Sequence, residues 1–254
     1  GDADGDGDID VFAAGDTVEL FSNPGDLDGA WPRQIIVDDV GGVRAIETLD
    51  TNRDGVVEFV TLADEGGGTL RLHGFQDGWG SFVIMNGVDA ELMAVGDMNR
   101  DGRADVVAAA ADGLLVALGQ PNGTFNAGLL PLQGLTPSTS IALADWDHDG
   151  HLDIVGGADG FACVALLNDG DAEAFAPTPV SLDGPDGYAD ARVLAAFDVD
   201  HDGDVDIQYM ALEVEDSRAG EVVWFYPNGG YAALGSSAAD RGTVNGRFAR
   251  NGVV

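Results

Sequence analysis

The sequence predicts an all-β fold, and three observations support this prediction. The motif D-x-[DN]-x-D-G-x-x-[DE] begins at residues 2, 50, 97, 145 and 198, so successive starts lie 48, 47, 48 and 53 residues apart. Short apolar runs separated by Gly-containing turn signals follow each motif, and helical periodicity is absent. The 38 glycines also disfavour long helices. Four strands in a repeat of about 48 residues are typical of a β-propeller blade, so we predict that residues 1–254 form a single propeller domain of five four-stranded blades.

Each blade is expected to present its elements in the same order. A first strand, such as 92–95, precedes the motif, the motif forms a loop, and a second strand, such as 105–107, follows it. A hairpin turn leads to a third strand, such as 114–118, and a Gly turn such as 122–123 leads to a weaker fourth strand. The Ala-rich run 106–111 has helical propensity, but its place in the repeat predicts a strand.

The two ends of the chain are expected to complete one blade together. No strand precedes the motif at residue 2, and residues 247–254, written before residue 1, resemble the stretch that leads into the motif at 97. The C-terminal strand is therefore predicted to complete blade 1. Within one chain this closes the ring and removes its exposed edges, whereas between chains it links subunits head to tail into a filament. Both remain open from the sequence, and effective concentration favours closure within one chain.

The motif has the chemistry of a calcium loop. Calcium takes six to eight oxygen ligands; positions 1, 3 and 5 of such a loop supply side-chain oxygens, position 7 a backbone carbonyl and position 9 a further acid. We therefore predict five Ca²⁺ ions, one for each motif. The predicted side-chain ligands are Asp2, Asp4, Asp6, Asp10, Asp50, Asn52, Asp54, Glu58, Asp97, Asn99, Asp101, Asp105, Asp145, Asp147, Asp149, Asp153, Asp198, Asp200, Asp202 and Asp206. The predicted backbone ligands are Asp8, Val56, Arg103, His151 and Asp204.

Other metal sites fit the motif less well. An EF-hand needs a bidentate Glu at position 12 and flanking helices, whereas position 12 here is occupied by Ala13, Thr61, Ala108, Gly156 and Tyr209. Magnesium prefers few protein ligands and several waters. Zinc prefers Cys or His, and neither occupies a predicted side-chain ligand position.

The charge of the chain excludes several kinds of partner. Its 254 residues include 45 Asp and Glu but only 11 Lys and Arg, which gives a formal net charge of −34. Such a surface repels nucleic-acid phosphates and anionic lipids. No apolar run reaches the roughly 20 residues that span a membrane, and no signal peptide is present. We expect no nucleic-acid binding and no membrane insertion, and we expect the mature form if the protein is exported.

With these loops and turns, the repeat resembles the FG-GAP/VCBS type found in integrin α-subunit-like β-propellers and in many secreted bacterial and fungal proteins. The resemblance covers the five motifs and N-G-x-F-like turns such as 122–125. In that family the calcium loop joins the first two strands of a blade. The resemblance implies an extracellular, calcium-stabilised propeller used as an adhesion, lectin or scaffold module, and sometimes as a domain of polysaccharide lyases.

The expected function is therefore that of a non-catalytic adhesion, carbohydrate-binding or structural module, with glycans or extracellular proteins as partners. One alternative is the subunit of a head-to-tail filament; another is a polysaccharide lyase or other carbohydrate-active domain. No nucleophile–base motif is present, so we predict no catalytic residue and no cofactor besides calcium. Residues 122–124 form a glycosylation sequon in a predicted surface turn. Tryptophans could stack on sugars but more often pack between blades; they are Trp31, Trp79, Trp146 and Trp224.

Overall fold

A computed structural model describes most of the chain. The described residues are 1–26, 29–38, 40–75, 79–111, 113–132, 137, 139–158, 161–172, 175–180, 188–197, 205–213 and 220–226. They contain 18 strands and one 3-10 helix, Glu65–Gly67, so the all-β prediction is confirmed. No helix among these residues is long and apolar enough to cross a membrane. Contacts divide the chain into two units, 1–131 and 132–254, which are described in turn.

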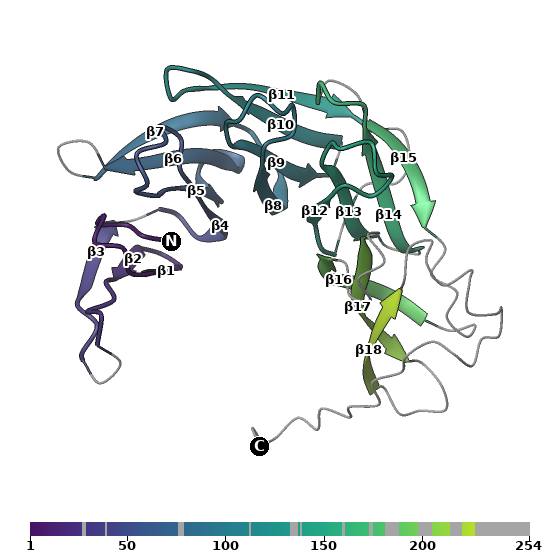
Figure 1. The fold of residues 1–254 in the computed structure, drawn as a ribbon, viewed down its shortest axis with the longest axis horizontal. Coiled ribbons are helices and arrows are strands. Elements are labelled where there is room, and N and C mark those ends of the chain that lie inside the picture. Colours follow the sequence, from purple (N-terminus) through teal and green to yellow (C-terminus); the bar gives the residue numbers. More distant parts are fainter. Residues whose placement is uncertain are drawn as a thin grey trace. The chain divides into compact units, whose positions relative to one another are not determined.

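Three antiparallel sheets build the first unit, and in each sheet the strands follow one another in chain order (Figure 1). The first sheet holds β1 (Val11–Ala14), β2 (Val18–Phe21) and β3 (Arg33–Val37). The second sheet holds β4 (Val43–Leu49), β5 (Glu58–Ala63), β6 (Thr69–Phe75) and β7 (Trp79–Asn86). The third sheet holds β8 (Ala90–Gly96), β9 (Asp105–Ala110), β10 (Gly113–Gly119) and β11 (Phe125–Pro131).

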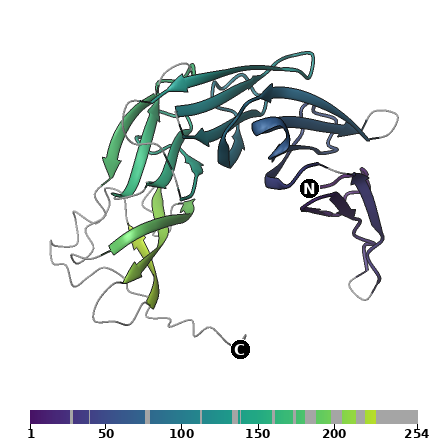
Figure 2. The same ribbon diagram turned by 180° about the vertical axis from the view of Figure 1, so that it is seen from behind.

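Two antiparallel sheets build the second unit with the same chain-order connection, which Figure 2 shows from behind. The fourth sheet holds β12 (Ala142–Ala144), β13 (Asp153–Ala158), β14 (Phe161–Asn168) and β15 (Phe175–Val180). The fifth sheet holds β16 (Tyr188–Phe197), β17 (Asp206–Glu213) and β18 (Gly220–Tyr226). The strands that the prediction adds to the first and fifth sheets fall within residues 227–254, which lie outside the described residues.

The motifs lie where the sequence places them. We call them the first loop (2–10), second loop (50–58), third loop (97–105), fourth loop (145–153) and fifth loop (198–206). The second, third and fourth loops each join the first two strands of a four-stranded sheet, as predicted. The first loop precedes β1, and the fifth lies between β16 and β17, although residues 198–204 lie outside the described residues.

Inner strands carry the core of the first unit. Every residue of β5 and β9 is buried, which explains why the Ala-rich run forms a strand: small side chains fit where sheets pack closely on both faces. A core cluster joins residues of the second and third sheets, among them Leu62, Leu70 and Leu115. Burial of this apolar surface is the main force that holds the two sheets together.

Aromatic side chains fill the space between the first and second sheets. The Phe59 ring is fully buried; its centroid lies 5.0 Å from that of Phe12 and 5.3 Å from that of Trp79. The Trp79 ring meets Phe12 edge to face, with centroids 6.0 Å apart. Trp79 therefore packs between sheets, the commoner role for such residues.

One buried histidine predicts a specific pH dependence. His73 on β6 stacks on Phe59 at 4.6 Å, and its Nε2 shares a hydrogen bond of 2.8 Å with the Thr61 hydroxyl. Burial, together with the charge of Arg71, lowers the His73 pKa from 6.5 to about 4. The folded state therefore stays neutral while the unfolded chain gains a proton below pH 6.5, so the stability present above pH 6.5 is lost as the pH falls towards 4.

We expect the free energy of unfolding to drop by about 2–3 kcal/mol more in the wild type than in His73→Gln between pH 7 and pH 4.5. Denaturant titrations of both proteins at the two pH values measure this difference. Because the same carboxylates titrate in both proteins, their contribution to the drop in unfolding free energy cancels when the two proteins are compared. An equal drop in both proteins would show that His73 does not carry this pH dependence.

Candidate metal loops and an adjoining groove

The four loops that the structure describes share one backbone conformation. Position 4 has a positive φ in each, at Gly5 (79°), Arg53 (62°), Arg100 (56°) and His148 (62°). The Gly at position 6 also has a positive φ, at Gly7 (92°), Gly55 (88°), Gly102 (81°) and Gly150 (90°). Non-glycine residues adopt this conformation at an energetic cost, so its recurrence at two arginines and a histidine shows that the loop imposes it.

Hydrogen bonds hold the acids of each loop in matching places. The Oδ2 atom at position 1 accepts the N–H of the position-6 glycine, for Asp2 (3.0 Å), Asp50 (3.0 Å), Asp97 (2.7 Å) and Asp145 (3.0 Å). The Oδ1 atom at position 5 accepts the N–H of position 7, for Asp6 (2.9 Å), Asp54 (2.8 Å), Asp101 (2.9 Å) and Asp149 (2.8 Å). The Oδ1 atom at position 3 accepts the N–H of position 5, for Asp4 (3.3 Å), Asn52 (2.9 Å), Asn99 (3.1 Å) and Asp147 (3.3 Å). Backbone N–H groups of each loop thus fix the side chains at positions 1, 3 and 5.

The acid at position 9 ties each loop to its sheet. It is buried in all five loops, at Asp10, Glu58, Asp105, Asp153 and Asp206. In the third loop, Asp105 Oδ2 accepts the N–H of Met98 at 2.9 Å, and Oδ1 accepts the N–H of Gly119, at the end of β10, at 2.8 Å. Asp10 and Asp153 make the same pair of bonds, to Ala3 and Asn23 and to Trp146 and Asn168. Sequence reasoning missed this clamp; the signal was an acid directly before a fully apolar strand.

The second loop departs from this clamp because its position-9 acid is longer. Glu58 Oε2 accepts both the N–H and the hydroxyl of Thr51, at 2.8 and 2.7 Å, and Oε1 accepts the Asn52 amide at 3.3 Å. Glu58 therefore binds within its own loop. The ligand role of position 9 remains a prediction in every loop.

Carboxylates converge in two of the loops. One oxygen each from Asp2, Asp4 and Asp10 lie within 4.8 Å of one another in the first loop. Asp145, Asp147 and Asp149 form an equivalent group in the fourth loop. Like charges at this separation repel one another unless a cation lies between them, and three convergent carboxylates suit a hard cation such as Ca²⁺.

An oxygen without a hydrogen-bond partner and several raised pKa values show how the loop acids respond to their surroundings. Asp145 Oδ1 is a buried atom without a hydrogen-bond partner, which is costly unless a cation or water binds it. Burial, together with the nearby charges of Asp10 and Asp6, raises the Asp4 pKa. Burial also raises the pKa of Asp105 and of Asp153, although backbone N–H groups partly offset it.

The remaining predicted ligands do not form such groups among the described residues. The described acids of the second and third loops form no group of three within 4.8 Å, and Asp6 and Asp153 lie outside the two convergent sets. Of the predicted ligands in the fifth loop only Asp206 is described, and Asp198, Asp200, Asp202 and Asp204 lie outside the described residues. The predicted backbone ligands Asp8, Val56, Arg103 and His151 occupy position 7 in loops of the shared conformation.

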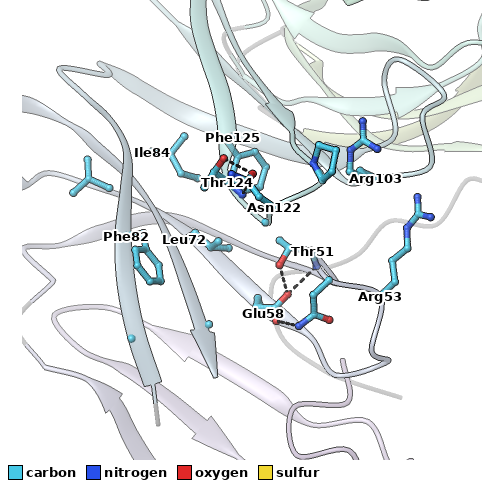
Figure 3. Close-up of a pocket in the computed structure, with 16 residues that line it drawn as sticks. Thr51, Arg53, Glu58, Leu72, Phe82, Ile84, Arg103, Asn122, Thr124 and Phe125 are labelled. Carbon is cyan, nitrogen blue, oxygen red and sulfur yellow. Dashed lines mark hydrogen bonds between the residues drawn. The ribbon is translucent and has the colours of Figure 1, made fainter. Parts of the chain in front are cut away.

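A groove of about 970 Å³ adjoins the second loop (Figure 3). Phe82 on β7 is 67% exposed, and it lies across the groove from the side chains of Arg53 and Arg103. Asn122 and Thr124, in the turn between β10 and β11, line it as well. The groove thus combines apolar and aromatic surface with amide, hydroxyl and guanidinium groups.

The turn that carries the sequon is exposed, as predicted. Asn122 Oδ1 accepts the N–H of Thr124 at 3.2 Å and its hydroxyl at 2.7 Å. Gly123 has a φ of 75°, which closes the turn in a conformation that favours glycine.

Comparison with known proteins supports the resemblance. Residues 97–156, from the third loop through the fourth, match the FG-GAP-like repeat. No curated protein matches the chain. Among solved structures, a lectin from Agrocybe aegerita, described by its specific recognition of non-reducing terminal N-acetylglucosamine, matches with a TM-score of 0.53 at 23% identity. The match covers 72% of this chain and 51% of the lectin, so it spans about half the lectin's length and bears on the fold alone. The resemblance to the FG-GAP type is thereby confirmed over residues 97–156.

Proposed function

We propose that this chain is a calcium-stabilised, non-catalytic β-propeller module that binds carbohydrate outside the cell. The observation that carries the calcium proposal is the convergence of three carboxylates in the first loop and three in the fourth. In the fourth loop, Asp145, Asp147 and Asp149 would hold the ion together with the His151 carbonyl. Bound calcium would neutralise the repulsion between these groups and so stabilise the loops.

The groove beside the second loop is the proposed carbohydrate site. Sugar rings present apolar faces that pack on aromatic side chains, and hydroxyls that hydrogen-bond to amides and guanidinium groups. Phe82 offers such a face, and Asn122 and Arg53 offer donors. The fold likeness to a lectin supports the class of ligand, so glycans that end in N-acetylglucosamine are the first probes to try.

Replacement of Phe82 by alanine tests this site. We expect Phe82→Ala to weaken glycan binding at least about tenfold, equal to about 1.4 kcal/mol, because it removes the more exposed of the two aromatic rings that line the groove. The exposed position should leave stability within about 0.5 kcal/mol of wild type. A glycan array followed by calorimetry with the best glycan measures both effects.

Leu129→Ala is the matched control, because Leu129 on β11 is another exposed apolar residue, at 44%, that does not line the groove. It should bind glycan as the wild type does. Equal affinity of Phe82→Ala and the wild type would place the sugar elsewhere, and an array without any bound glycan would refute the carbohydrate proposal.

The completed propeller is also a proposal. The chain has five motifs, and the described residues form five sheets. The first of these sheets has three described strands, with β1 at its edge. The C-terminal strand is proposed to pair with this edge, either within the chain or on a neighbouring subunit. Electron microscopy separates single closed particles from head-to-tail filaments. The lyase alternative remains a prediction that no observation here favours.

A further inference from the structure

The third loop departs from the metal-binding arrangement at its position-5 acid. Asp101 Oδ1 accepts the backbone N–H of Arg103 at 2.9 Å, as the position-5 acid does in every described loop, but Asp101 Oδ2 in addition forms an ion pair with the Arg103 guanidinium. Arg103 Nε donates to the carbonyl of Gly119 at 2.8 Å, which anchors the guanidinium at the end of β10. Both oxygens of a predicted calcium ligand are therefore engaged by one arginine.

The position-1 acids of the third and fourth loops differ as well. Asp97 Oδ1 accepts the N–H of Asp101 at 3.0 Å. Asp145 Oδ1, its counterpart in the fourth loop, is buried without a hydrogen-bond partner. In the first and second loops the same oxygen also accepts a backbone N–H, from Gly5 at 2.7 Å and from Arg53 at 2.6 Å. Among the described loops this difference therefore sets the fourth loop apart as the one with an oxygen free for an ion.

Formal charge also makes the third loop less favourable for a cation than the fourth loop. The third loop contains three acids, and two arginines of its own, Arg100 and Arg103, act on it together with Arg53 of the second loop. The Arg53 guanidinium donates to the carbonyls of Gly102 and, at 3.5 Å, of Asp101. By its own residues, the third loop has a formal charge of −1, whereas the fourth loop, with four acids and no Lys or Arg, has a charge of −4. Arg53 adds a further positive charge beside the third loop. The third loop therefore attracts a dication such as Ca²⁺ less strongly than the fourth loop does.

We infer that Arg103 takes the place of the metal ion in the third loop, so that this loop keeps its shape without calcium. Position 7 in the other described loops is Asp8, Val56 or His151, and none carries a guanidinium. This inference rests on the proposed calcium binding by the other loops. Its consequence is that the third-loop wall of the groove, which Arg103 lines, does not depend on calcium.

Counting bound ions by native mass spectrometry in calcium-containing buffer tests the inference. Asp97→Asn should bind as many ions as the wild type, because the third loop holds none. Asp145→Asn should bind one ion fewer. Arg103→Ala should bind one ion more, since Asp101 is released, and adding Asp97→Asn to it should restore the wild-type number. Arg100→Ala removes the same charge from an exposed position of the same loop and should leave the number unchanged.

Each of these ion counts either supports or overturns the inference. One ion fewer in Asp97→Asn would overturn the inference while leaving calcium binding intact. An unchanged number in Arg103→Ala would show that Arg103 is not what excludes the ion; if this variant does not fold, Arg103→Gln, which keeps most of the side-chain stem, takes its place. A wild-type chain without any bound calcium would overturn the proposed function, and this inference with it.

Discussion

Removal of calcium with a chelator is expected to lower the melting temperature of the chain by about 10–20 °C. A site held at ~100-fold over its dissociation constant adds about 2.7 kcal/mol by linkage, so two sites add about 5 kcal/mol. For a chain of this size each kcal/mol corresponds to about 2–4 °C. The physical reason is the repulsion among the convergent carboxylates of the first and fourth loops, which the ion relieves.

Thermal unfolding followed by circular dichroism measures this effect, with and without chelator. Excess calcium should restore the original melt. Asp145→Asn should lose about half of the calcium-dependent shift, because the first loop still binds its ion. A melting temperature that is the same with and without chelator would contradict the proposal that these loops hold calcium.

Asp105→Ala is expected to lower the free energy of unfolding by about 3–5 kcal/mol, because hydrogen bonds to a charged group contribute about 1.5–3 kcal/mol each. The Asp105 side chain is fully buried and accepts the N–H groups of Met98 and Gly119, so its removal takes a charged acceptor from two buried N–H groups. Denaturant titration measures the loss. The same loss is expected in chelator, because the third loop is inferred to hold no ion.

Two matched variants accompany this measurement. Asp105→Asn keeps one acceptor oxygen in nearly the same volume and should cost about 1–3 kcal/mol. Asp89→Ala removes an exposed acid that pairs with Arg44 at the surface and should cost less than about 1 kcal/mol. A loss for Asp105→Ala no larger than that for Asp89→Ala would show that the clamp contributes little.

The repeat made the strand order and the loop positions predictable. A motif that requires acids, a left-handed turn and a glycine at fixed positions leaves little local freedom, and the strands on either side follow from it. The Ala-rich run that forms β9 shows the value of the repeat, because its position overrides its helical propensity.

Features that depend on packing were not predictable from the motif. The clamp of Asp105 joins the loop to Gly119, whose position is set by the pairing of β9 with β10. The groove brings Phe82 of β7 near the turn at Asn122, and only the packing of two sheets places them together. The Arg103–Asp101 ion pair depends on the direction of a long side chain, which the repeat pattern does not determine.

The central claim is that convergent acids of the loops bind calcium in the folded chain. Calorimetric titration of calcium into the chelator-stripped protein, alongside Asp145→Asn, tests it most directly. Saturable binding of at least two ions by the wild type, and of one ion fewer by the variant, is the predicted result. Absence of saturable binding, or equal stoichiometry in the two proteins, would contradict the claim.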